Sequence, residues 1–302
     1  MKRNEHDPLI PSPLSPNADA GWPTVTKELS ETAGRNVGHV FDAVLRSIEE
    51  LSATVVDLVR ERGRPGREEL SPLRLEILGV LEGHAPLVTG TGFVAAPDVL
   101  ADAPLWLEWW QAGDGPDPER LVVDLDPASL GFYDYTDKPW YTVPDRTRGA
   151  YVHGPYVDYH GTDQYILTMS APVLSEPVLS EPVPSQPALS EPALSEPVPA
   201  ESGRDDTAGG ARFLGITGAD LYLRRVEKTV LPLLPPGAIL LNSQGRVIIS
   251  RSARHVTGAL LRRLDIGAAD RAGAPVEVAG GGMLARCGRL GLYLLTPLIP
   301  LH

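Results

Sequence analysis

Aromatic and acidic side chains are concentrated in one part of this 302-residue chain, between residues 121 and 223. The aromatic residues are Tyr133, Tyr135, Trp140, Tyr141, Tyr151, Tyr156, Tyr159 and Tyr165, and the acids are Asp134, Asp137, Asp158, Asp163 and Asp220. Tyr and Trp offer an apolar ring with a polar tip. A carboxylate beside such a ring attracts a small cation through charge and through the ring's electrons. The stretch is therefore compatible with a cation pocket, although composition alone favours a sheet in which the aromatics simply pack.

The strand pattern brings two of these residues together. Residues 151–159 alternate as a strand, so Tyr156 and Asp158 lie on one face. Residues 159–162 form a turn in this interpretation, and residues 164–170 return as the partner strand. Asp220 has a plainer alternative role, because an acid at the start of a predicted helix over residues 220–234 is also a good N-cap that needs no ligand.

Five short segments carry a resemblance to a known family. Tyr133 is followed five residues later by Lys138, then by the pair Trp140-Tyr141, by Tyr156-Val157-Asp158, and by Asp220. In this order they resemble the amino-acid-sensing branch of double Cache domains, which are PAS-like sensor modules of bacterial chemoreceptors and sensor kinases. That branch has Arg where this chain has Lys138. The resemblance covers about a third of the chain.

The resemblance implies a fold and a ligand. The fold would be a PAS-like α/β Cache fold, with a long N-terminal helix and a mostly antiparallel sheet with flanking helices. The ligand would be an amino acid or a biogenic amine, bound without catalysis or cofactor, and its binding would signal through a partner or an oligomer contact. Asp158 and Asp220 would hold the ammonium group, Tyr133, Trp140, Tyr141 and Tyr156 would form the walls, and Lys138 would hold any carboxylate.

Lys138 leaves the ligand class open. It keeps the positive charge of the family's Arg but lacks the planar pair of donors that grips a carboxylate. An amino acid therefore remains possible with a changed grip. An amine without a carboxylate is the alternative, in which Lys138 would be an exposed lysine paired with Asp137 or Asp134.

The elements that would position this site follow from hydrophobic periodicity. Residues 24–62 carry one apolar stripe at helical spacing, so we expect a long helix that packs on its own domain or, alternatively, pairs in a homodimer. We expect a second helix over residues 72–82 and a third over 256–264. Expected strands are residues 87–95, 121–125, 212–218, a hairpin over 238–250, and one or two strands within 276–295; residues 105–111 form a strand or a helical turn.

Pro-rich sequence sets the domain boundaries. Residues 174–198 are five pentapeptides of the LSEPV type, whose regular prolines forbid helix and sheet, so we expect an expanded hairpin loop. We assign residues 1–23 to a disordered tail and residues 24–234 to a Cache-like ligand-binding domain, with the insert spanning 174–210. Residues 235–302 would either complete the sheet or form a degenerate second Cache module.

Composition excludes several function classes. A net charge of -12 argues against nucleic acid as a partner. The single cysteine, Cys287, and the lack of an apolar run long enough to span a membrane favour a cytoplasmic protein. No nucleotide-binding or hydrolase motif is present, and His153, Asp158, His160 and Asp163 lack a recognised metal-site spacing, so we expect no metal. The alternatives to a sensor are an interaction module with a decayed pocket and an enzyme with an unrecognised site.

Overall fold

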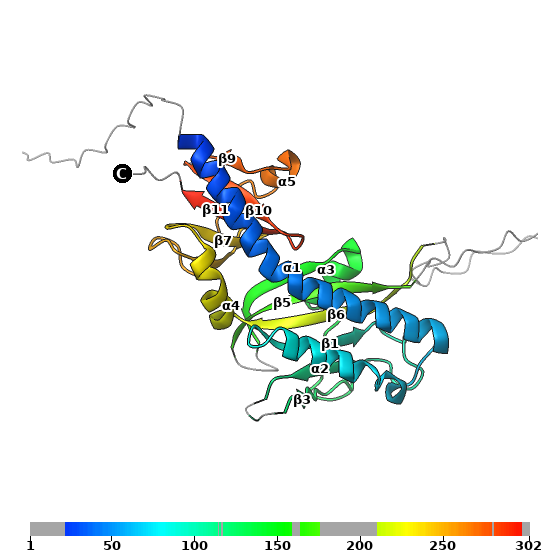
Figure 1. Cartoon of the computed structure of the whole chain (residues 1–302). Coiled ribbons are helices and arrows are strands. Elements are labelled where there is room, and N and C mark those ends of the chain that lie inside the picture. Colours follow the sequence, from blue (N-terminus) through cyan, green and yellow to red (C-terminus); the bar gives the residue numbers. More distant parts are fainter. Residues whose placement is uncertain are drawn as a thin grey trace, which may run out of the picture.

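The computed structural model describes residues 22–113, 115, 117–158, 164–175, 210–279 and 281–297. Two antiparallel sheets lie along one long helix, α1 (Trp22–Arg62), which contacts strands of both (Figure 1). The expected turn over 159–162, nearly all of the insert and residues 1–21 lie outside the described residues. In the described part of the chain, no helix has the length and apolarity needed to cross a membrane.

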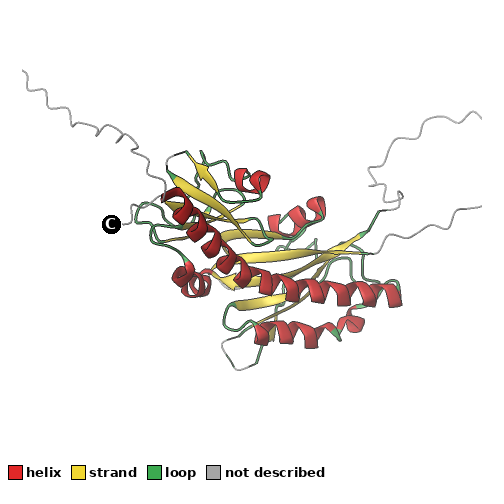
Figure 2. Cartoon of the chain, turned by 45° about the horizontal axis from the view of Figure 1, so that its top comes forward, coloured by secondary structure: helices red, strands yellow, loops and turns green. Residues whose placement is uncertain are grey.

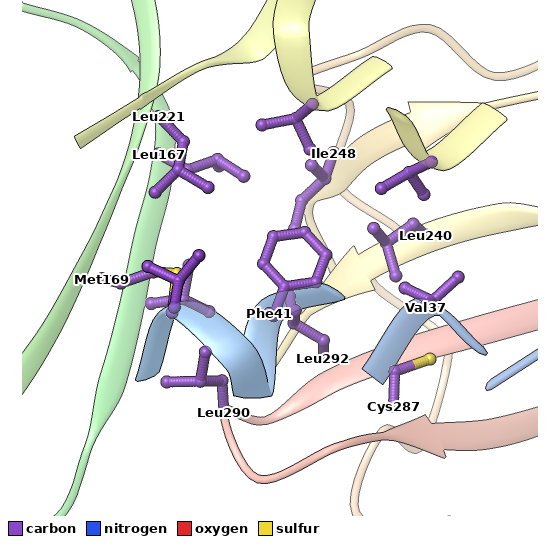
Figure 3. Packing of buried hydrophobic residues seen from close by; sticks show 14 of the residues in the cluster. Val37, Phe41, Leu167, Met169, Leu221, Leu240, Ile248, Cys287, Leu290 and Leu292 are labelled. Carbon is purple, nitrogen blue, oxygen red and sulfur yellow. The ribbon is translucent and has the colours of Figure 1, made fainter. Parts of the chain in front are cut away.

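Helix α1 confirms the long amphipathic helix and provides the shared core. It begins at Trp22, so Trp22 and Pro23 belong to the helix and not to the tail. Phe41 is fully buried between Leu167 and Met169 of the first sheet and Ile248 of the second (Figure 3). Gly38 allows this closeness, because a Cβ there would lie 2.5 Å from the backbone nitrogen of Gly288. The buried stripe explains why the helix is long: one helix closes two cores.

The first sheet has six strands in the order β3-β2-β1-β6-β5-β4. Their bounds are β1 Val88–Ala95, β2 Leu107–Gln111, β3 Glu119–Arg120, β4 Tyr151–Val157, β5 Tyr165–Leu174 and β6 Phe213–Tyr222. Helices α1 and α2 (Leu73–Gly83) lie along one face, with the short 3-10 helix η1 (Arg67–Leu70) between them in sequence (Figure 2). On the opposite face, α3 (Pro139–Thr147) and residues 121–135 cover a second apolar cluster. The expected hairpin of β4 and β5 is confirmed.

The second sheet is separate from the first and has the order β8-β7-β11-β10-β9. Helix α4 (Leu223–Val230) and the 3-10 helix η2 (Leu231–Leu233) lead into it from β6. Its elements are β7 Ile239–Asn242, β8 Val247–Ser250, α5 Ala268–Ala272, β9 Val276–Val278, β10 Gly282–Cys287 and β11 Leu292–Pro297. The C-terminal strands therefore do not extend the first sheet, but form a core of their own that shares α1.

Two expected elements, a strand over residues 121–125 and a helix over residues 256–264, are absent. Residues 121–125 alternate as predicted, with Leu121 and Val123 inward and Val122 82% exposed, yet they form no strand. Pairing with β2 ends after Leu121, and the backbone then turns around Asp124. Residues 256–264 are not helical either, since Val247 donates its backbone N–H to Ala259 and thereby ties this segment to β8.

The expected helix over residues 220–234 is wrong at its start. Strand β6 continues to Tyr222 because it pairs with β1 on one side and with β5 on the other. These two ladders satisfy the backbone groups that a helix would otherwise have to satisfy. Asp220 is consequently a strand residue and no N-cap, and α4 begins at Leu223.

Candidate functional site

A cavity lies on the face of the first sheet that α3 covers. Side chains from five strands, from α3 and from the segment before it line the cavity: Val94, Leu107, Trp109, Gln111, Leu121, Val123, Tyr133, Trp140, Tyr156, Asp158, Thr168 and Asp220. The space in which the centre of a water molecule fits is about 40 Å³. Since one water needs about 10–15 Å³ of such space, the enclosed part suits a group of only a few atoms. A larger ligand would extend through the mouth.

Asp220 lies at the centre of the polar network in this cavity. Thr168 is its direct neighbour on β5 and donates its hydroxyl to Asp220 Oδ1 at 2.6 Å. Tyr156 on β4 is the next residue of the network, and its hydroxyl lies 2.8 Å from Thr168 Oγ1. The contacts of the described residues include no hydrogen bond to Asp220 Oδ2, so this oxygen is the acceptor that the cavity offers to a ligand.

A glycine on the neighbouring strand makes room for this arrangement. Gly90 on β1 lies opposite Asp220 in the ladder. A Cβ at Gly90 would lie 2.8 Å from Trp109 Nε1 and 3.6 Å from Asp220 Oδ2. Any larger residue would push the indole away from the carboxylate. The aromatic ring and the acid can therefore be close together only because position 90 has no side chain.

The electrostatics of the lining favour a cation. Asp158 and Asp220 are the charged groups among the lining residues, which include no Lys, Arg or His. Burial, with a smaller contribution from the Asp158 carboxylate, raises the pKa of Asp220 to about 7 against the opposing effect of the Thr168 hydrogen bond. Burial and the same two acids also raise the pKa of Tyr133 and of Tyr156, so both hydroxyls stay neutral. A positive group would relieve the repulsion between the acids.

The cavity brings together five of the seven residues selected from the sequence. Tyr133, Trp140, Tyr156, Asp158 and Asp220 all line it. Tyr156 and Asp158 share a face, as the alternation of β4 predicts.

Tyr141 and Lys138 do not line the cavity. Tyr141 is buried beside it, with its ring 5.4 Å from that of Tyr135 and 5.6 Å from that of Phe213, both edge to face. Lys138 precedes α3, and its Nζ pairs with Asp137 Oδ1 at 2.8 Å near the surface. This is the exposed pairing that the sequence offered as the alternative to carboxylate binding.

Sequence reasoning missed Thr168, Trp109 and Gln111 as lining residues. For Trp109 and Gln111 the available signal was their two-residue spacing from Leu107 along β2, which puts all three side chains on one face. For Thr168 no local signal exists. Its contact with Asp220 depends on the register between β5 and β6, which the long insert separates in sequence.

Comparisons with known proteins identify the fold. No family model matches the chain, and no curated protein matches it. Among solved structures, the extracellular domain of a predicted histidine kinase is similar with a TM-score of 0.55 and 14% identity, over 91% of this chain and 93% of that one. A second such domain gives a TM-score of 0.50 and 15% identity, over 91% and 94%.

A chemoreceptor provides a third similar structure. The ligand-binding domain of the Pseudomonas fluorescens chemoreceptor CtaA, solved in complex with L-valine, gives a TM-score of 0.51 and 12% identity. The match covers 92% of this chain and 97% of that domain. At such low identity the likeness establishes the fold. It confirms the Cache-type fold expected from the sequence: a long N-terminal helix with antiparallel sheets.

Proposed function

We propose that this protein binds a small amine-bearing metabolite, an amino acid or a biogenic amine, in the cavity around Asp220, and acts as a sensor without catalysis. The observation that carries the proposal is a half-buried carboxylate with an available oxygen in a small aromatic cavity whose lining has no cationic residue. Ionising Asp220 without a counter-charge is costly at this site, as its raised pKa shows. An ammonium group removes that cost.

Each lining group has a role in this proposal. Asp220 accepts a hydrogen bond from the ammonium through Oδ2, with Thr168 holding Oδ1 in place. Asp158 provides the second negative charge. Tyr133, Trp140 and Tyr156 surround the cation with ring surfaces, which attract it further. The L-valine complex of one structural neighbour supports an α-amino acid as a member of this ligand class.

The position of Lys138 is relevant to whether the ligand carries a carboxylate. The Lys138 ammonium group pairs with Asp137 and does not line the cavity. We therefore expect no direct ion pair between Lys138 and a ligand carboxylate in the present conformation. Gln111 is the neutral polar residue of the lining that offers hydrogen-bond donors there. Amines without a carboxylate therefore belong in the ligand search beside amino acids.

Binding would be transmitted through the elements around the cavity. Behind Asp220 on β6, Thr217 donates its hydroxyl to the carbonyl of Ile48 on α1 at 2.7 Å. At the edge of the sheet, Asn242 on β7 donates its side-chain amide to the carbonyl of Gly154 on β4 at 2.8 Å. A ligand that shifts β4 or β6 would thus act on α1 and on the second sheet. The output would be a change in a partner or homodimer contact.

A thermal-shift screen tests the proposal. Purified full-length protein is melted with single amino acids, polyamines and biogenic amines, and a ligand of the folded state raises the melting temperature by mass action. We expect a shift with one ligand class in the wild-type chain and none in Asp158→Ala. Asp117→Ala, which removes an exposed acid outside the cavity, is the matched control and keeps the shift.

Three results would contradict the proposal. No shift with any amine would favour the interaction module with a decayed pocket. An equal shift in Asp158→Ala and in wild type would place the ligand elsewhere. Consumption of the shifting amine by the purified protein would favour the enzyme alternative.

A further inference from the structure

A groove lies on the face of strand β2 opposite the cavity. Because successive strand residues point to opposite faces, Leu107 and Trp109 line the cavity while Trp106, Glu108 and Trp110 line the groove. The opposite wall is formed by η1, the start of α2 and residues 101–102. The groove shares no lining residue with the candidate amine site.

A buried acid fixes the two tryptophans at the groove floor. Glu108 is only 8% exposed. It accepts the indole N–H of Trp110 at 2.9 Å on one oxygen and that of Trp106 at 3.3 Å on the other. Both rings are therefore held by one carboxylate and keep a partly exposed surface. Such rigid, half-exposed aromatics are typical of sites that bind another chain segment.

Three arginines are stacked on this pair of rings. The guanidinium carbons of Arg67 and Arg120 lie 5.2 and 4.4 Å from the centre of the Trp106 ring, and that of Arg74 lies 4.4 Å from the Trp110 ring. A stacked guanidinium directs its N–H groups away from the ring and toward acceptors. Arg67 pairs with Asp102 and Arg120 pairs with Glu108, while the ion pairs seen among the described residues include none for Arg74. The lining also holds Glu68 and Glu69, so Arg74 is the stacked guanidinium that the groove offers to a partner beside its aromatic surface.

The chain carries a segment with the matching chemistry. Between residues 176 and 209 there are seven acids, seven prolines and a single basic residue, Arg204. Proline-rich segments bind aromatic grooves in many recognition domains, because the chain loses little entropy on binding. The glutamates of residues 176–209 would pair with a guanidinium group of the groove. Hydrogen bonds between two charged groups are stronger than those between neutral groups.

The base of this segment is next to the groove wall. Leu214, just after the segment, accepts the backbone N–H of Ala96 at 2.9 Å. The connection that starts at Ala96 carries Asp102 and Trp106 of the groove, and Arg64 holds it through the carbonyl of Asp98 at 3.1 Å. A segment of 34 residues reaches on the order of 100 Å when extended. It is long enough to enter the groove and return.

We propose that the groove formed by Trp106, Trp110 and their stacked arginines is the docking site for the chain's own acidic, proline-rich segment, residues 176–209. Glutamates of the segment pair with Arg74, and prolines contact the exposed parts of the two indoles. This proposal is independent of the amine ligand, because no group in the groove takes part in the cavity.

Competition by a labelled peptide tests the docking in the full chain. A fluorescent peptide of residues 174–201 is titrated by anisotropy against the wild-type chain and against a chain with E176Q, E181Q, E191Q, E196Q and E201Q. We expect the peptide to bind the neutralised chain about tenfold more tightly, because the tethered wild-type segment competes at an effective concentration on the order of 1 mM. Raising the salt concentration weakens the binding, since the contacts are exposed ion pairs.

Variants in the neutralised chain locate the contact. R74E lowers the peptide's affinity at least about tenfold, whereas R263E, the same charge change at an exposed residue outside the groove, leaves it unchanged. R74Q replaces R74E if the latter lowers the melting temperature. Absence of binding, equal affinity for both chains, or equal loss in R74E and R263E would overturn the proposal. Equal binding of an unrelated acidic peptide would also overturn it, by assigning the groove to acidic segments in general.

Discussion

Replacing Asp220 by asparagine measures how much stability the folded protein loses when Asp220 ionises inside the cavity. Asparagine keeps the size of the side chain and an oxygen for the Thr168 hydroxyl, but it cannot ionise. Because the folded-state pKa of Asp220 is raised to about 7 from 3.8, the unfolded chain ionises this acid at lower pH than the folded chain. Wild type therefore loses stability relative to the variant as pH rises from about 4 to about 7, and above pH 7 the loss is complete.

The size of the effect follows from the two pKa values. The full cost is the difference between them times 1.36 kcal/mol per unit, or about 4 kcal/mol, as an upper bound. At pH 5 about 1.7 kcal/mol of this cost is present, so between pH 5 and pH 8.5 the difference should grow by about 3 kcal/mol. Any residual solvent contact of Asp220 through the cavity reduces the figure.

Urea unfolding of both proteins at pH 5 and pH 8.5 measures this difference. We expect the free energy of unfolding of Asp220→Asn to exceed that of wild type clearly at pH 8.5 and only modestly at pH 5. Titrating groups that do not interact with Asp220 affect both proteins equally and cancel. If the variant and wild type differ by the same amount at both pH values, the carboxylate is not held in a cavity that disfavours its charge, and the reasoning fails.

Three further predictions concern other residues, one inside the cavity and two outside it. Thr168→Val removes the hydrogen bond that lowers the Asp220 pKa, so ligand binding, followed by titration calorimetry across pH, should need a higher pH than in wild type. Lys138→Ala breaks only an exposed pair with Asp137; urea unfolding should show a loss below about 1 kcal/mol, and a larger loss would reveal an unseen structural role. Phe41→Ala leaves a void between both sheets and α1 and should cost about 3–5 kcal/mol in the same assay, while Leu75→Ala, at a 79% exposed position, should cost little.

The fold was predictable where the pattern is local. The apolar stripe of α1 and the alternation of β4 each depend on residues a few positions apart, and both are confirmed. The pattern over residues 121–125 was equally clear, but a strand also needs a partner, and β2 pairs only as far as Leu121. Hydrophobic alternation shows which side chains face the core. It does not show whether the backbone finds a neighbour.

In the candidate site, too, the features that depend on local sequence could be predicted, and those that depend on strand pairing could not. Tyr156 and Asp158 follow from alternation, whereas Asp220 resembled an N-cap because an acid preceded a helical pattern. Only the pairing of β6 with two neighbours places Asp220 within a strand and brings Thr168 to its side. Lys138 matched a motif position, yet its backbone conformation just before α3 leaves its side chain with Asp137. The role of the seven selected residues in ligand binding and the cytoplasmic location stay predictions.

Titration calorimetry at pH 8 with the amine that gives the largest thermal shift tests the central claim most directly. We expect binding to wild type and an affinity at least about a hundredfold lower for Asp220→Asn, because the ammonium loses its charged partner in a largely desolvated cavity. The asparagine variant should remain fully folded in the same buffer. Equal affinity of the two proteins would contradict the claim that Asp220 holds the ligand's ammonium group.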